Sequence, residues 1–308
     1  MTNSWGMLVA AAVLVGVGLP AVREVHAAGP VTQVVEISGH RARFDDGNPA
    51  FVRYLLIDPG NADPSVDGFA PIPRIAVLML FTGGDGRLNL ALNQLNAGSP
   101  NFLVRTRNHF AAEGYVVAVV DAASDFLAHN HPDATDANGF VHGSGLRGHR
   151  LPNRLYGAQH LQDLAAVMND LRGRYPQLPV WAVGTSRGTV SAAVTAAAVA
   201  PPADGIVLTS SLTGPDGFED MQGVDLEAVS APALIVTHRD DDCPVTKPED
   251  SQTLKRRFTA SPRVQVLLFQ GGNTPLSNPC DPLAPHGFFG IEQRVINAIA
   301  RWIKHAEP

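Results

Sequence analysis

The stretch "VGTSRGTVSA", residues 183–192, places a serine between two glycines where a strand-like pattern changes to a helix-like one. The apolar run "PVWAVG" precedes the serine, and a series of small residues follows it. In a sharp strand-to-helix turn, such a serine takes a strained backbone conformation and raises its hydroxyl above the sheet edge. Gly184 and Gly188 fit this interpretation because a side chain at either place would collide as strand and helix pack together. Ser186 is therefore the candidate nucleophile; the alternative is an ordinary tight turn.

Apolar runs alternate with helical patterns along the rest of the chain. The turn-prone "DDGNP" between the first two runs predicts a hairpin, and the remaining runs are apolar on both faces, as in parallel strands covered by helices. The sequence therefore predicts an α/β fold with an eight-stranded, mostly parallel sheet and helices on both faces. The expected strands are residues 31–37, 50–57, 74–81, 115–121, 179–184, 205–211, 232–238 and 264–272, and the expected helices are residues 102–114, 156–175, 188–200, 247–258 and 291–305.

The composition excludes several classes of protein. With 308 residues and 45% apolar content, the chain can bury a large core, and nothing marks it as disordered or fibrous. The formal net charge is −6, and Lys and Arg do not gather into a stripe. Nucleic acid is therefore not an expected partner.

The N-terminus carries an uncharged apolar run, "MLVAAAVLVGVGLPAV", at residues 7–22. "VHAAG" follows, so Ala27 or Ala28 can be the small residue before a cleavage site. The run is shorter than the roughly 20 residues of a membrane-spanning helix. We therefore expect a cleaved signal peptide at residues 1–28, a single mature domain at 29–308, export, and no stable membrane insertion after cleavage. An uncleaved anchor is the alternative, and the first six residues lack the Lys or Arg typical of a signal.

A serine hydroxyl is a weak nucleophile unless a histidine accepts its proton and an acid orients that histidine. In the α/β fold that places its nucleophile on such a turn, the acid and then the histidine follow the serine along the chain. The Pro- and Gly-containing loop "CDPLAPHGFFG" offers His286 after the last expected strand. His238 ends a strand and His305 lies in the terminal segment, so His286 is the predicted base.

The acid is expected after the strand at residues 232–238, where the sequence reads "VTHRDDDCPV". Asp240, Asp241 and Asp242 all compete for this role. Asp216, in the loop after the preceding strand, is a minor rival.

An acyl-transfer site also needs N–H donors for the negatively charged oxygen of its tetrahedral intermediate. One is expected from the backbone of Arg187, the residue after the nucleophile, and another from the loop after the third strand. That loop reads "FTGGDG", and Gly84 is the predicted donor, with Gly83 close behind. The alternative is a plain glycine turn.

Taken together, "GTSRG", "HRDDDC", "PHGFFG" and "TGGDG" resemble the corresponding segments of the α/β-hydrolase family, in particular small exported bacterial hydrolases, over nearly all of the mature chain. The family's spacing, with the acid two residues before an apolar or cysteine position, favours Asp241. The resemblance implies a serine hydrolase without metal or organic cofactor. Only about twenty residues separate the strands at 205–211 and 232–238, which is too few for the helical cap of many members.

The two cysteines, Cys243 and Cys280, are expected to form a disulfide, since exported proteins seldom keep thiols reduced. Cys243 is two residues past Asp241 and Cys280 is six residues before His286, so the bond would hold the acid loop against the histidine loop. Two free buried thiols are the alternative.

The long segment "ASDFLAHNHPDATDANGFVHGSGLRGHRLPN", residues 123–153, is expected to lie over the carboxyl edge of the sheet, where substrates bind. Its histidines and aspartates suggest a metal site, but they show no helical i, i+4 pair and no cysteine partner. We therefore predict no metal there.

The predicted activity is hydrolysis of a small carboxylic ester through an acyl-enzyme on Ser186. A peptidase or a lactone or polyester hydrolase would use the same three residues, because the fold does not determine the acyl donor. A catalytically silent binding protein is the alternative from another class. The sequence does not indicate the oligomeric state.

Overall fold

The computed structural model describes residues 22–23, 26–27, 31–43, 46–61, 71–93, 99–128, 157–214 and 221–306. The predicted leader lies outside these ranges except for two dipeptides that pair with strand β3, Val31–Ala42. Most of the expected substrate-side segment, from residue 129 onward, and Asp216 also lie outside them. Among the described residues, no helix is long and apolar enough to cross a membrane.

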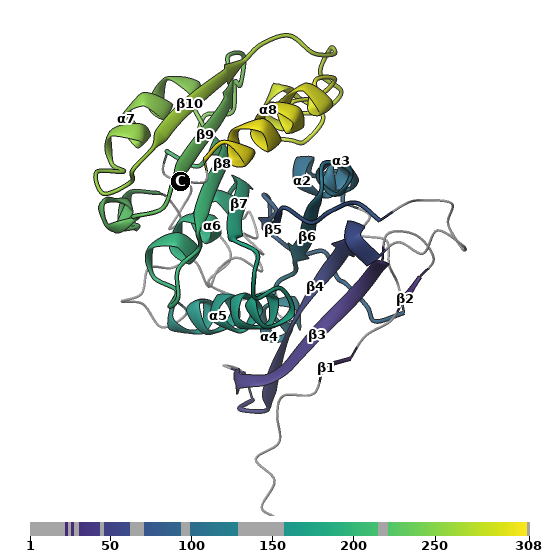
Figure 1. Ribbon diagram of the computed structural model, residues 1–308. Coiled ribbons are helices and arrows are strands. Elements are labelled where there is room, and N and C mark those ends of the chain that lie inside the picture. The colour runs from purple at the N-terminus through teal and green to yellow at the C-terminus, as the bar shows by residue number, and fades with distance from the viewer. Residues whose placement is uncertain are drawn as a thin grey trace, which may run out of the picture.

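The described strands form one sheet in the order β1-β3-β4-β6-β5-β7-β8-β9-β10, with β2 beside β3 (Figure 1). β3, β4 and β6 pair antiparallel, whereas the pairs from β6 through β10 are parallel. β1 and β2 have only two residues each, so the predicted eight-stranded, mostly parallel sheet and its first hairpin are confirmed. The strands are β1 Val22–Arg23, β2 His26–Ala27, β3 Val31–Ala42, β4 Pro49–Asp58, β5 Ala76–Phe81, β6 Tyr115–Val120, β7 Val180–Ser186, β8 Gly205–Ser211, β9 Ala233–His238 and β10 Val264–Phe269.

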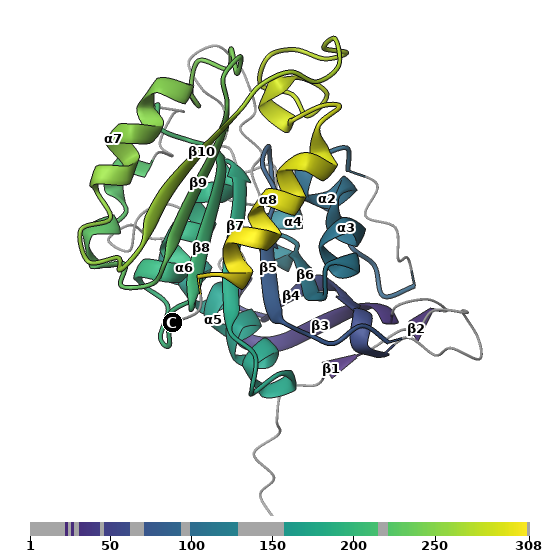
Figure 2. The ribbon, with the colours of Figure 1, turned by 45° about the horizontal axis from the view of Figure 1, so that its top comes forward.

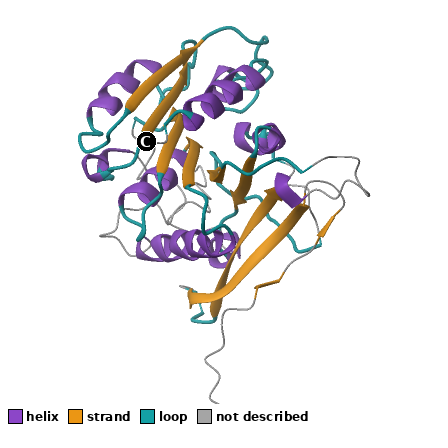
Figure 3. Ribbon diagram, in the orientation of Figure 1, coloured by secondary structure: helices purple, strands orange, loops and turns teal. Residues whose placement is uncertain are grey.

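Helices cover both faces of the sheet, as Figures 2 and 3 show. The side chains of α5, α6 and α7 enter one apolar core, and those of α2, α3 and α8 enter a second core on the opposite face. All six residues of β5, β6 and β9 are buried, because each of these strands is covered on both sides. The helices are α2 Phe102–Arg105, α3 Arg107–Ala112, α4 Ser124–Ala128, α5 Gly157–Arg174, α6 Gly188–Ala197, α7 Ser251–Arg256 and α8 Glu292–Lys304.

Short 3-10 turns occupy several of the remaining connections. They are η1 Pro59–Asn61, η4 Met221–Gly223, η5 Leu226–Ala228, η6 Pro248–Asp250 and η7 Pro285–Gly287. Between β8 and β9 the described residues contain only η4 and η5, so the prediction that no large cap is inserted there is confirmed. The histidine loop contains η7, which directly precedes the turn into α8.

The predicted helix at residues 102–114 is divided in two. α2 ends at Arg105, and α3 begins at Arg107. The buried Thr106 hydroxyl donates to the Phe102 carbonyl oxygen at 2.7 Å, so this side chain takes part in ending the first turn. Hydroxyl side chains compete with the backbone for hydrogen bonds in this way, and periodicity alone does not show it.

A buried charge cluster joins the antiparallel hairpin of β3 and β4 to the helices α4 and α5. Arg41 on β3 donates to Asp125 at 2.6 and 2.7 Å and to Asp163 at 2.7 Å, and His40 Nε2 lies 2.6 Å from the same Asp163. Beside this cluster, His160 on α5 lies 3.3 Å from the Ser191 hydroxyl on α6. This contact joins α5 to α6, the helix that follows the strand-to-helix turn.

Burial lowers the pKa of His160 from 6.5 to about 4; Asp163 opposes this change and Arg41 adds to it. As the pH falls from 6.5 towards 4, His160 takes up a proton in the unfolded chain but stays neutral in the folded chain, because its pKa is lower in the folded chain. We expect stability to decrease over this window by on the order of 3 kcal/mol through His160. Urea unfolding at pH 7 and pH 4.5 measures this loss, which should be much smaller in His160→Gln. The exposed His305→Gln is the control, and an equal acid loss in all three proteins would contradict the assignment.

Candidate active site

Ser186 ends β7 and α6 begins two residues later, so the serine stands at a strand-to-helix turn. Its φ is +53°, a left-handed conformation that costs roughly 1–3 kcal/mol for a residue other than glycine. A Cβ on Gly184 would lie 2.3 Å from the Gly188 carbonyl oxygen. A Cβ on Gly188 would lie 2.3 Å from the Phe81 carbonyl oxygen. Both glycines are therefore needed for strand and helix to approach this closely.

Threonine hydroxyls hold the strained turn in place. Thr209 on β8 donates to the Gly184 carbonyl oxygen at 3.0 Å, and Thr189 on α6 donates to the Ser186 carbonyl oxygen at 2.5 Å. Thr189 also accepts the backbone N–H of Leu212 at 3.1 Å. The neighbouring strand β8 and the helix α6 thus hold the serine in position.

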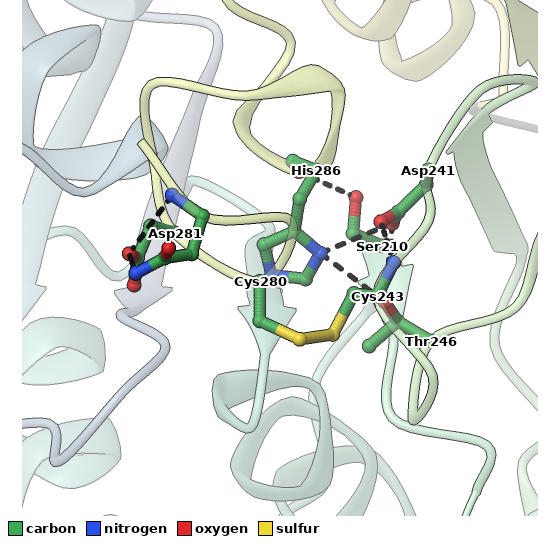
Figure 4. The surroundings of a disulfide bond; sticks show 8 residues. Ser210, Asp241, Cys243, Thr246, Cys280, Asp281 and His286 are labelled. Atoms are coloured by element: carbon green, nitrogen blue, oxygen red, sulfur yellow. Dashed lines mark hydrogen bonds and ion pairs between the residues drawn. A yellow bond between two sulfur atoms is a disulfide. The ribbon is translucent and has the colours of Figure 1, made fainter. Parts of the chain in front are cut away.

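The structure brings Asp241 and His286 together from loops 45 residues apart in the chain. His286 Nδ1 lies 3.0 Å from Asp241 Oδ2, and both side chains are buried (Figure 4). The other Asp241 oxygen accepts the backbone N–H of Cys243 at 3.1 Å. The aspartate is therefore held at both oxygens and presents one of them to the imidazole.

The competing acids and bases lie elsewhere. Asp240 and Asp242 are exposed, and the Asp240 carboxylate lies 3.9 Å from His238 Nδ1. His238 Nε2 bonds to the Gly271 carbonyl oxygen at 2.8 Å at the end of β9. His305 is exposed at the C-terminal end of α8. Of these candidates, only Asp241 contacts His286.

Ser186 and His286 line one cavity of about 180 Å³. Between these two described side chains there is no direct hydrogen bond in this conformation. Catalytic hydrogen bonds are often long before substrate binds and shorten in the complex. Because Nδ1 of His286 is hydrogen-bonded to Asp241, the other ring nitrogen, Nε2, is the one available to a neighbouring hydroxyl.

The glycine loop after β5 forms another wall of this cavity, through Gly83 and Gly84. A Cβ on Gly83 would lie 2.7 Å from the Ser186 Cβ, so only glycine allows the loop to pass the serine. Gly84 has a φ of +68° and open space around it. Arg187, the other predicted donor residue, is the N-cap residue of α6.

Asp121, at the end of β6, holds the continuation of this glycine loop. Its carboxylate accepts the backbone N–H groups of Leu88 and Leu90 at 2.7 Å each and of Ala122 at 2.8 Å. Burial raises the pKa of Asp121, and these backbone donors act in the opposite direction. The neighbouring parallel strand thereby positions the loop above the sheet edge.

Cys243 and Cys280 form a disulfide with an S–S distance of 2.03 Å. The bond joins the loop after β9, which carries Asp241, to the loop that carries His286 (Figure 4). Cys243 is buried, and Cys280 lines the cavity beside Ser186 and His286. The pairing follows the predicted connection between the two loops.

Two residues of the site carried no signal in the sequence. Thr246, buried, donates its hydroxyl hydrogen to Asp241 Oδ2 at 3.1 Å and also lies 3.1 Å from His286 Nδ1. Ser210 donates to the His286 carbonyl oxygen at 2.7 Å. Ser210 occupies the register shift between β7 and β8 and has a φ of +43°, so an irregularity at the strand end directs it towards the histidine loop.

The described residues contain no group of three or more His, Cys, Asp or Glu side chains arranged to hold a metal ion. The histidines of the expected substrate-side segment, His129, His131, His142 and His149, lie outside the described residues. His160 and Asp163 form contacts with Ser191 and with β3, and neither lines the cavity of Ser186.

No model of a known protein family matches this chain, and no curated protein matches it either. Solved structures do match it. A cold-adapted esterase from an Arctic intertidal metagenomic library has a TM-score of 0.55 at 13% identity, over 94% of this chain and 100% of that chain. A thermostable carboxyl esterase from Bacillus coagulans has a TM-score of 0.54 at 14% identity, over 89% and 98%. Dienelactone hydrolase from Anabaena variabilis has a TM-score of 0.50 at 11% identity, over 93% and 99%.

These matches cover 89–94% of this chain. The protein therefore has the α/β-hydrolase fold.

Proposed function

We propose that this protein is a serine hydrolase that cleaves small carboxylic esters, with Ser186 as nucleophile, His286 as base and Asp241 as the acid that orients it. One observation carries the proposal: a buried imidazole, hydrogen-bonded to a buried carboxylate, lines the same cavity as a serine with a φ of +53°. A strained serine beside an oriented imidazole is the arrangement that activates a hydroxyl for acyl transfer. That the structural neighbours named above are esterases or a lactone hydrolase supports the same reaction class.

In the proposed mechanism, the Ser186 hydroxyl attacks the ester carbonyl carbon while His286 Nε2 accepts its proton. Asp241 keeps the imidazole in the tautomer with Nδ1 protonated and stabilises the imidazolium that forms. The backbone N–H groups of Gly84 and Arg187 donate to the oxygen that becomes negative. The imidazolium then protonates the leaving alcohol, and a water activated by the same histidine releases the carboxylic acid.

Esters with short acyl chains are the proposed substrates. The cavity of about 180 Å³ at Ser186 and His286 is small compared with typical ligand pockets of roughly 300–1,000 Å³. An exported location is part of the proposal, because a disulfide is typical of oxidising compartments. We therefore expect the protein to act on a small ester in the periplasm or outside the cell.

The test uses the purified protein, a fluorophosphonate probe, and p-nitrophenyl esters of increasing chain length beside matched amides and lactones. We expect esters with short chains to give the highest kcat/KM, and peptide mapping to find the probe on Ser186. Preference for lactones would favour the reaction of the matched dienelactone hydrolase. A folded protein that neither hydrolyses any of these compounds nor takes up the probe would refute the proposal and favour a binding function.

Thr246→Val is expected to lower kcat by about 10- to 100-fold with little change in KM. The substitution preserves volume but removes a hydrogen bond to the Asp241 carboxylate, and such bonds to charged groups contribute about 1.5–3 kcal/mol. The matched control is Thr246→Ser, which keeps the hydroxyl and should retain most of the activity. Equal kcat for the Val and Ser variants would show that the hydroxyl does not help to position the pair.

A further inference from the structure

We infer that the side-chain amide of Asn101 is a third donor to the substrate's carbonyl oxygen, beside the backbone N–H groups of Gly84 and Arg187. The inference rests on the proposed function. It concerns a residue that lines the cavity with Ser186 and His286 but that no sequence pattern indicated.

The orientation of this amide follows from its hydrogen bonds. Asn101 is the N-cap of α2, and its Oδ1 accepts the backbone N–H of Leu103 at 3.1 Å. An amide whose oxygen is used in this way must present its NH₂ group on the other side. Among the described residues, no acceptor for Asn101 Nδ2 is found, so its two N–H donors are available at the cavity wall.

The position of Nδ2 follows from Gly83. The point where a Cβ of Gly83 would stand is 3.4 Å from Asn101 Nδ2 and 2.7 Å from the Ser186 Cβ. The amide nitrogen and the Ser186 side chain thus both lie beside Gly83, with no room for a side chain at residue 83. All three residues line the cavity together with Gly84, and the carbonyl oxygen of a bound ester would lie in this cavity.

Arg105 holds Asn101 in place relative to the histidine. Its guanidinium donates to the carbonyl oxygen of Pro100 at 2.8 Å and to that of Gly287 at 2.6 Å. It also binds Glu292 on α8 at 2.9 Å. The segment before α2 is therefore fastened to the turn that carries His286, so the amide is held in position before substrate arrives. Donors held in advance are the ones that stabilise a developing negative charge most effectively.

Asn101→Asp separates this role from helix capping. Aspartate caps a helix as well as asparagine does, so the bond to Leu103 is kept, while both amide donors are lost. We expect kcat to fall by about 10²- to 10³-fold, the usual effect of removing one such donor, with a smaller change in KM. The thermal midpoint should stay at or above that of the wild type. The rate of fluorophosphonate labelling at Ser186 should fall with kcat, because the probe's phosphoryl oxygen occupies the same position.

Asn101→Ser is the neutral companion variant, and it decides the question if the aspartate variant fails to fold. Its hydroxyl caps α2 but ends one bond short of the amide nitrogen, so we expect a loss similar in direction without an added charge. If either folded variant keeps kcat within about threefold of the wild type, the inference is wrong while the proposed function stands. A wild type that neither turns over esters nor reacts with the probe would overturn both.

Discussion

Replacing Ser186 with alanine is expected to lower kcat/KM for the best ester by roughly 10⁴- to 10⁶-fold and to abolish fluorophosphonate labelling. Alanine removes only the oxygen that would form the proposed acyl-enzyme bond, so no covalent route would remain. The variant should be folded, with a stability close to that of the wild type. Alanine keeps the left-handed conformation at residue 186 and its cost, so the substitution does not relieve the backbone strain.

The matched control is Ser230→Ala, a substitution at an exposed serine outside the cavity, which should leave activity and labelling unchanged. Circular dichroism and thermal unfolding of all three proteins verify that the fold is retained. Labelling that persists in Ser186→Ala would show that another residue is the nucleophile, and the proposed assignment of the site would then be wrong.

Removing the disulfide with Cys243→Ala and Cys280→Ala together is expected to destabilise the protein by about 3–4 kcal/mol, the chain-entropy value for a closed loop of this size. For a chain of this length, that corresponds to a decrease in the thermal midpoint of roughly 6–16 °C. We also expect kcat to fall, because the bond joins the loops that carry Asp241 and His286.

Dithiothreitol provides an independent measurement of the same effect. Cys280 is exposed, so the reductant has access to the bond. The wild type should lose stability and activity on reduction, whereas the double alanine variant, which has no disulfide, should not respond. A wild type whose thermal midpoint and kcat are both unaffected by reduction would refute the structural role of the bond.

Much of the fold could be predicted from the sequence because its signals are local. Strands buried on both faces appear as continuous apolar runs, such as the one that became β5, Ala76–Phe81. The helix α8 appears as apolar residues at helical spacing, and its Val295, Ile296 and Ile299 are buried. The division between α2 and α3 was missed because it involves the Thr106 hydroxyl and a carbonyl oxygen, which leave no mark on periodicity.

The candidate site was predictable to different degrees for different residues. The role of Gly184 and Gly188 could be predicted from the sequence, because at a strand-to-helix turn these glycines indicate a close approach that leaves no room for a Cβ. Among the three consecutive aspartates, residue type does not distinguish one from another. Burial does: the structure encloses Asp241 and leaves Asp240 and Asp242 in solvent.

The sequence by itself determined the order of strands and helices, the sharp turn at Ser186 and the candidates for its partners, because each depends on residues close together in the chain. Only the tertiary structure decided which side chains meet. Thr246 reaches His286 across 40 residues, Ser210 reaches it across 76, and Asn101 shares a cavity with it. Such contacts form because the parallel strands place their carboxyl ends at the same edge of the sheet. The function of a hydroxyl or amide group depends on which atoms lie beside it, and the sequence alone does not show these neighbours.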